Sequence, residues 1–131
     1  MLRNLFRLLA VVAVAGTLAA CRTAPVYNVE NALFTNEAPS LDAAATQIKL
    51  AGSSLGWQVA EESPGHLVAR LPIRTHLAVV DIRHDKKSYS ITYKDSSNLR
   101  YDGTVIHSNY NGWIQNLQNA IAARTSSYAG S

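Results

Sequence analysis

Cysteine is almost absent from this sequence of 131 residues, in which Cys21 stands alone. A chain with one cysteine forms no internal disulfide bond, and a leftover cysteine in an exported protein needs an explanation of its own. The sequence also lacks a Gly-rich phosphate loop, and its four histidines show no short metal-ligand spacing such as H-x-x-x-H. We therefore expect no bound metal and no cofactor.

The sequence also lacks an apolar run of about 20 residues, the length that a transmembrane helix needs. The run from Leu8 to Leu18 has instead roughly the 7–15 residues of a signal-peptide core, and Arg3 and Arg7 supply the positive charge that precedes such a core. At its end, Leu18-Ala19-Ala20-Cys21 resembles the bacterial lipobox. The alternative is an incidental cysteine in an ordinary secretory signal or a membrane helix.

The lipobox resemblance implies cleavage before Cys21 and attachment of diacylglycerol to its thiol. Several acyl chains on one residue make such an anchor effectively permanent. In proteobacterial lipoproteins an aspartate after the cysteine favours the inner membrane, and here Arg22 follows. We therefore expect a lipid-anchored protein of the bacterial cell envelope, on the periplasmic side of the outer membrane if the source is Gram-negative.

A strong excess of either charge is missing as well. The chain has 12 basic and 9 acidic residues, and Arg3 and Arg7 leave with the signal, so the mature net charge is about +1. Bulk charge therefore gives no support for nucleic-acid binding. We expect the partners to be the membrane, through Cys21, and an envelope protein or cell-wall component.

Composition, motifs and turn-forming residues divide the chain into four parts. They are a lipoprotein signal peptide (1–20), a lipidated N-terminus and tether (21–39), a single α+β domain (40–124) and a frayed tail (125–131). The tether would span up to roughly 60 Å when fully extended. Its apolar residues, Val29 and Phe34 among them, suggest that part of it docks on the domain as an added edge strand.

Periodicity predicts the elements of the domain. Apolar residues at three- and four-residue spacing predict helices over 40–54 and 108–124, with Ser40 and Ser108 as N-caps. Alternating apolar residues predict four strands, at 57–61, 66–71, 76–83 and 88–93. The predicted fold is a two-layer α+β domain in the order helix, four-stranded antiparallel meander, helix, with both helices packed on one face of the sheet.

Two segments of the C-terminal half carry a family resemblance. Y-K-D-S-S-N-L-R-Y, from Tyr93 to Tyr101, and I-H-S-N-Y-N-G-W-I, from Ile106 to Ile114, resemble a group of small, functionally uncharacterised bacterial lipoproteins. The resemblance would cover about residues 41–121. It implies a location and no activity.

The same region holds the candidate binding surface, which mixes aromatic and amide side chains. Aromatic rings supply contact area, and Asn and His side chains fix orientation, a combination suited to sugars, peptides or a protein edge. The candidate residues are Tyr93, Asp95, Ser96, Asn98, Tyr101, His107, Asn109 and Asn111. The alternative is that Asn98, His107 and Asn109 only tie a long loop to the start of the last helix by hydrogen bonds to the backbone.

These features favour a non-enzymatic binding or assembly accessory of the envelope. Two alternatives remain open. One is a small periplasmic hydrolase that uses Ser96 or Ser97 with His107, although no nucleophile elbow surrounds either serine. The other is a carrier of lipid or another small ligand, which would need a cavity of about 300 Å³ or more between the sheet and the helices.

Overall fold

The computed structural model describes residues 22–128, so the predicted signal peptide (1–20) and the lipobox cysteine, Cys21, lie outside the described residues. The elements in chain order are β1 (Thr23–Pro25), β2 (Val29–Leu33), α2 (Leu41–Ser54), β3 (Gln58–Ser63), β4 (His66–Ile73), β5 (His76–His84), β6 (Ser88–Ser97), β7 (Val105–His107) and α3 (Ser108–Arg124). Neither described helix is long and apolar enough to cross a membrane.

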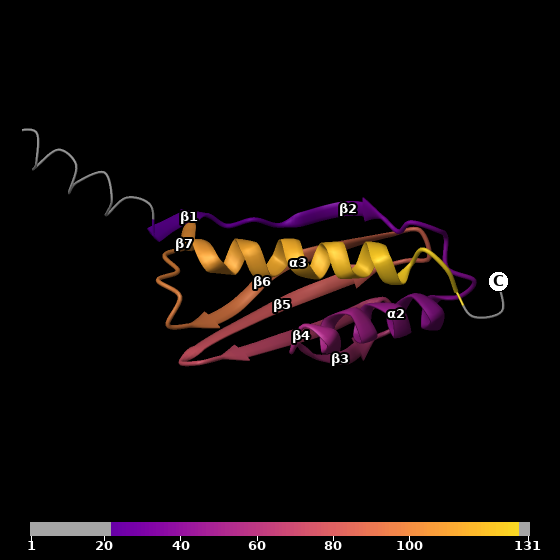
Figure 1. The fold of residues 1–131 in the computed structure, drawn as a ribbon, viewed down its shortest axis with the longest axis horizontal. Helices are drawn as coiled ribbons and strands as arrows, with labels where there is room; N and C mark the ends of the chain where they lie inside the picture. Colours follow the sequence, from indigo (N-terminus) through magenta and orange to yellow (C-terminus); the bar gives the residue numbers. More distant parts are fainter. Residues whose placement is uncertain (1–21, 129–131) are drawn as a thin grey trace, which may run out of the picture.

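Five strands form one antiparallel sheet in the order β2-β6-β5-β4-β3 (Figure 1). Strands β3 to β6 make the expected meander, in which each strand pairs with the next. The α+β class is therefore confirmed, but the sheet has five strands where four were predicted. A second sheet of two short strands, β1 and β7, was not predicted.

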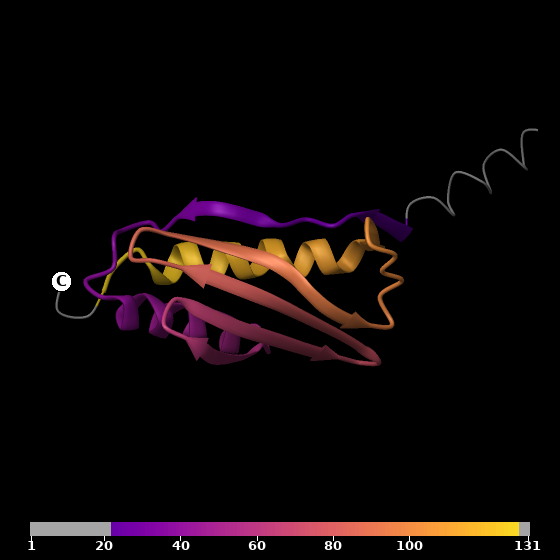
Figure 2. The same ribbon diagram turned by 180° about the vertical axis from the view of Figure 1, so that it is seen from behind.

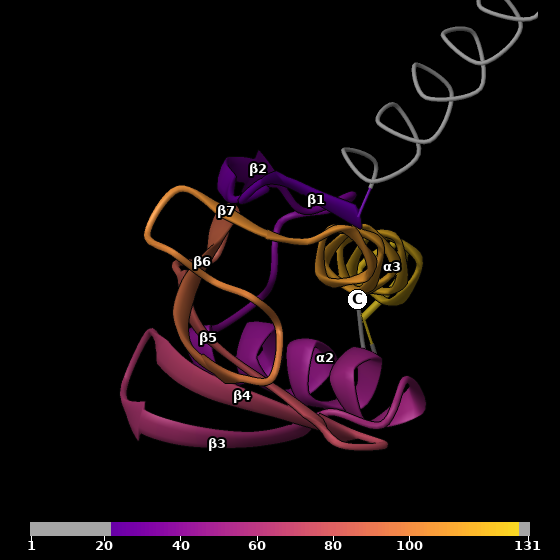
Figure 3. The ribbon, with the colours of Figure 1, turned by 90° about the vertical axis from the view of Figure 1, so that its left-hand side faces the viewer.

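Both helices lie on the same side of the sheet, which curves around them when the molecule is viewed from its end (Figure 3). From behind, the opposite face of the sheet carries no helix (Figure 2). Side chains from the sheet and both helices fill the space between the two layers. Fully buried members of this core include Ile48, Leu67, Val80, Ile82, Ile91, Tyr110, Ile114 and Leu117.

The helix ends follow local capping chemistry. The Ser40 hydroxyl accepts a hydrogen bond from the Ala43 amide at 3.0 Å, which satisfies one of the free donors at the start of α2. Helix α3 begins at the predicted residue, but its cap is His107 and not Ser108. The Nδ1 atom of His107 accepts from the Asn109 amide at 3.2 Å.

The segment that precedes α2 does not hang free as a tether. Val29 of β2 pairs with Ile91 of β6, so the prediction of an added edge strand is confirmed. The Phe34 and Ala38 amides donate to carbonyls of the β5–β6 hairpin, at 2.9 and 2.8 Å. The prediction of a tether over 21–39 is therefore wrong from Thr23 onward, because backbone pairing holds this segment along the domain.

The C-terminal tail is also packed for longer than expected. Thr125 is fully buried, and its hydroxyl oxygen accepts a hydrogen bond from the Thr35 amide at 3.1 Å. Tyr128 is buried with the core. The prediction of a frayed tail from residue 125 is corrected for residues 125–128, which close the domain against the segment after β2.

The close packing of α2 on β3 gives a direct test of this arrangement. A Cβ atom added at Gly52 would lie 2.7 Å from Cγ2 of Val59, so Gly52→Ala should lower the free energy of unfolding by about 1–3 kcal/mol. Gly112→Ala, in α3, is the matched control because nothing lies within 4 Å of its added Cβ. The control should stabilise the protein by up to about 1 kcal/mol. Urea unfolding of both variants measures the difference, and equal effects would contradict the packing described.

Candidate functional site

Five of the eight candidate residues line one surface cleft at the end of β6. Its volume is about 390 Å³, and it is formed by β6 and the loop that follows. The lining residues are Tyr93, Lys94, Asp95, Ser96, Asn98, Leu99, Arg100 and Tyr101. A register shift between Val79 and Val80 of β5 places an extra residue in β6 at this point. This irregularity changes the alternation of side chains where the cleft begins.

Tyr93 is the centre of the cleft. Its ring stacks on Tyr101 with a centroid distance of 3.9 Å and meets the edge of Tyr110 at 6.0 Å. Its hydroxyl is hydrogen-bonded to the Ser96 hydroxyl at 2.7 Å. Burial raises the pKa of Tyr93 above its ordinary value, while the Ser96 hydrogen bond opposes this shift. Tyr93 therefore stays a neutral phenol at neutral pH and offers hydrogen bonds rather than a base.

Residues 98–101 of the loop that follows β6 form one wall of the cleft. Leu99 anchors this loop, because the Leu99 side chain is buried and its carbonyl accepts from the His107 amide at 2.8 Å. The carboxylate of Asp102 closes the far turn by accepting from the Thr104 and Val105 amides, both at 2.9 Å. These amides hold the pKa of Asp102 below its ordinary value.

Asn98 links the cleft to the β4–β5 turn. The side-chain amide of Asn98 donates to the Thr75 hydroxyl at 2.8 Å, and the backbone carbonyl oxygen of Asn98 lies 2.6 Å from Nδ1 of His76. The His76 ring in turn lies 6.2 Å from the His107 ring and 6.4 Å from that of Trp113. Three segments distant in sequence therefore meet at this end of the domain.

The other three candidate residues lie at the start of α3 and do not line the cleft. His107 caps the helix through the Asn109 amide. Asn111 ties the N-terminal segment to the helix: its Oδ1 accepts from the Tyr27 amide, and its Nδ2 donates to the Pro25 carbonyl, both at 2.9 Å. Within residues 22–128 the Asn109 side chain makes no hydrogen bond.

The geometry gives no support to the hydrolase alternative. Ser96 is bonded to Tyr93, and no hydrogen bond in the described part of the chain joins His107 to Ser96 or Ser97. The letters G-x-S-x-G do occur from Gly52 to Gly56. They lie at the C-terminal end of α2, and the Ser54 hydroxyl donates to the Ala51 carbonyl, so no strand-to-helix elbow exposes this serine.

The uncovered face of the sheet carries a charge cluster that the sequence did not reveal. The Asp81 side chain, 13% exposed, lies 2.7 Å from Nε2 of His66 and within 4 Å of Arg83 and Lys94. Arg83 lies two residues from Asp81 on β5, and strand register brings in His66 from β4 and Lys94 from β6. Among residues 22–128, no three His, Cys, Asp or Glu side chains gather as a metal site would require.

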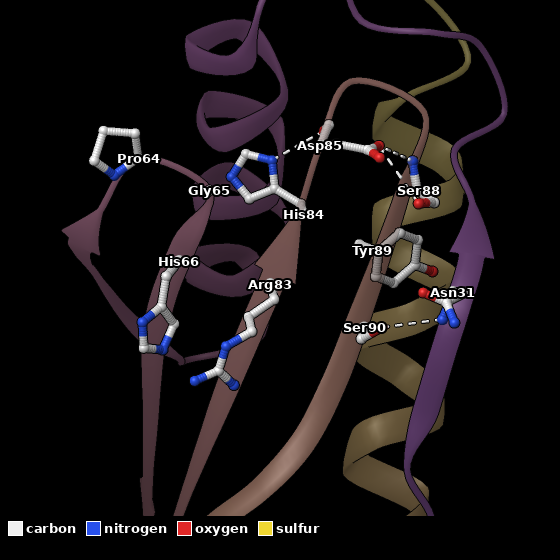
Figure 4. A pocket seen from close by; sticks show the side chains of 10 residues that line it. All are labelled: Asn31, Pro64, Gly65, His66, Arg83, His84, Asp85, Ser88, Tyr89 and Ser90. Carbon is white, nitrogen blue, oxygen red and sulfur yellow. Dashed lines mark hydrogen bonds between the residues drawn. The ribbon is translucent and has the colours of Figure 1, made fainter.

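A second surface pocket, of about 420 Å³, lies beside this cluster (Figure 4). Its lining comes from β2, the β3–β4 turn, β4, β5, the β5–β6 hairpin and β6. Asn31, Ser88 and Ser90 supply polar groups, and Arg83 extends along the open face. The Nε2 atom of His84 is buried and has no hydrogen-bond partner in the described structure. Burial raises the pKa of Tyr89 to about 12, so this phenol is neutral.

Comparisons of the chain with protein families, with curated proteins and with solved structures find no match.

The Asp102 turn predicts a specific pH dependence. The folded state depresses the pKa of Asp102, so its hydrogen bonds are fully present above the ordinary value of 3.8 and are lost as pH falls through the lower folded value. In an NMR titration, the Thr104 and Val105 amide protons should shift together with a midpoint below 3.8. In Asp102→Asn this titration should be absent. A midpoint above 3.8 would contradict the turn geometry.

The two hydrogen bonds of the Asn111 side chain should contribute measurably to the stability of the N-terminal segment. Asn111→Ala removes two hydrogen bonds to that segment and should cost about 1–3 kcal/mol of stability, with faster hydrogen exchange at the Tyr27 amide. Asn109→Ala is the matched control, since its side chain makes no hydrogen bond in the described structure. Equal exchange rates at Tyr27 in the two variants would show that Asn111 does not hold the segment.

Proposed function

We propose that the chain is a lipid-anchored lipoprotein of the bacterial cell envelope that acts without catalysis as a binding or assembly accessory. The single observation that carries the proposal is the start of the folded part. Thr23, two residues after the lipobox cysteine Cys21, already pairs with His107. At about 3.3–3.6 Å per residue, the chain between Cys21 and Thr23 spans at most about 7 Å. The anchor therefore holds one end of the domain at the membrane surface.

The domain is elongated, so an anchor at one end orients its long axis relative to the membrane (Figure 1). Strand β1, the β4–β5 turn, the loop before β7 and the start of α3 lie together at one end (Figures 1 and 3). We call this the membrane-proximal end. The β3–β4 turn and the β5–β6 hairpin lie at the opposite end, which faces away from the anchor. The cleft at Tyr93 is thus near the bilayer, and the pocket of Figure 4 is far from it.

The uncovered sheet face is the best candidate for contact with an envelope partner. Both helices cover the other face, so the polar face with Asp81, Arg83 and the Figure 4 pocket is the one that a partner reaches. Arg83 is 61% exposed there, and exposed arginine is enriched where proteins bind proteins. The filled space between sheet and helices gives the carrier alternative no support.

Site-specific photo-crosslinking in cells tests this function. A photoreactive residue in place of Arg83 should give one discrete crosslinked product. The same residue in place of Gln115, which is exposed on α3, should give none. Cys21→Ala should abolish incorporation of labelled palmitate into the protein, because no thiol remains to carry the lipid, and should abolish the product.

Two results would count against the proposal. One is crosslinking from Gln115 as strong as from Arg83, which would show that the sheet face is not the contact surface. The other is unchanged palmitate incorporation in Cys21→Ala, which would show that Cys21 is not the lipidated residue.

A further inference from the structure

Charge is distributed unequally between the two ends of the domain. Four exposed basic residues lie in the elements of the membrane-proximal end, namely Arg22, Arg74, Lys94 and Arg100, and of these Lys94 is paired with Asp81. This end has two acidic residues, Asp95 in β6 and Asp102 in the loop before β7, whose carboxylates accept from backbone amides and keep their negative charge. The opposite end holds Lys86 and Lys87 in the β5–β6 hairpin, together with acidic residues in the segment before α2, in the first turn of α2, at the end of β3 and in the same hairpin. The excess of positive charge therefore faces the anchor.

Two of these arginines adopt a backbone conformation that disfavours arginine. Arg74, in the β4–β5 turn, and Arg100, in the loop before β7, both have φ of +54°. Glycine or asparagine is the residue that such left-handed positions prefer. Both side chains are exposed, and within residues 22–128 neither makes an ion pair or a hydrogen bond. Each guanidinium group is therefore available to a polar group outside the domain.

Apolar and aromatic groups accompany the two arginines. Tyr101, next to Arg100, is 40% exposed, and Ile73, next to Arg74, is 36% exposed. Tyrosine is enriched where proteins meet the headgroup region of a membrane, because its ring is apolar and its hydroxyl polar. Lys94 and Arg100 also line the cleft that contains the Tyr93 and Ser96 hydroxyls. Cations, hydroxyls and a partly apolar rim together suit a phosphate that belongs to a lipid.

We propose that the membrane-proximal end binds the headgroup phosphates of anionic phospholipids in the membrane that holds the anchor, with Arg74 and Arg100 as the principal contacts. A guanidinium group matches the geometry of phosphate oxygens with paired N–H donors. The inference rests on the proposed anchoring at Cys21, which places this end within reach of the headgroups. It adds that the domain lies docked on the lipid surface in one orientation instead of swivelling on its anchor.

The experiment uses the mature lipoprotein reconstituted in nanodiscs. One set of nanodiscs contains phosphatidylcholine alone, and the other contains equal parts of phosphatidylcholine and phosphatidylglycerol. A polarity-sensitive dye on Thr104→Cys, which is exposed in the loop before β7, reports the ratio of docked to undocked protein. Acylation blocks the Cys21 thiol, so the introduced cysteine is the one that reacts with the dye.

Arg74→Asn and Arg100→Asn should each lower the docked ratio about fivefold in the anionic nanodiscs, and the double variant should lower it about 25-fold. The melting temperature should stay the same or rise, because asparagine suits both backbone positions. Lys86→Asn with Lys87→Asn, in the β5–β6 hairpin, removes the same charge from the opposite end and should leave the ratio unchanged. Added salt should weaken docking of the unaltered protein.

Two results would overturn the inference. They are a docked ratio in the double arginine variant equal to that of the lysine control, and equal docking of the unaltered protein in the two lipid compositions. Mass spectrometry of the same samples separates this failure from failure of the proposed function. If Cys21 carries no diacylglycerol, the anchoring falls and the inference falls with it. If Cys21 is acylated and the arginine variants still dock like the control, only the inference falls.

Discussion

The pairing of Thr23 with His107 is the constraint on which the position of the N-terminal segment depends. It fixes the first described residues to β7, the short strand before α3, and Asn111 extends the attachment by holding Pro25 and Tyr27. Further along, Thr35 is bonded to the end of α3, so the same segment touches both ends of that helix. A chain held in this way leaves only Arg22 between the lipobox cysteine and the fold. Under the proposed anchoring at Cys21, this strand pairing sets the distance between the domain and the membrane.

The two faces of the sheet differ because both helices lie on one of them (Figure 3). Two helices are enough to cover one face. The alternation of β4, β5 and β6 sends apolar side chains to that face and mainly polar ones to the other, where Val68 and Val79 also lie. The polar face is then free to hold Asp81 among His66, Arg83 and Lys94. Such partly exposed ion pairs add little stability, which makes this face a better candidate for recognition than for structural support.

The sequence predicted the parts of the fold that have a period. Both helices and the strands of the meander were found because their apolar residues repeat. Strands β1 and β7 have three residues each, too few to show alternation, and they were missed. At the site, residues 93–101 were predicted together because they are close in sequence. The links from Asn98 to Thr75 and from Asp81 to His66 depend on strand register, which local patterns do not contain.

The central claim is that the folded domain begins at the membrane surface. Neutron reflectometry of the mature lipoprotein on a supported bilayer tests it most directly, because it measures the thickness of any water layer between the headgroups and the protein. The account predicts that protein density begins within about 7 Å of the headgroups, the span of two residues. A water layer of about 60 Å, the reach of a free tether over the residues before α2, would contradict it.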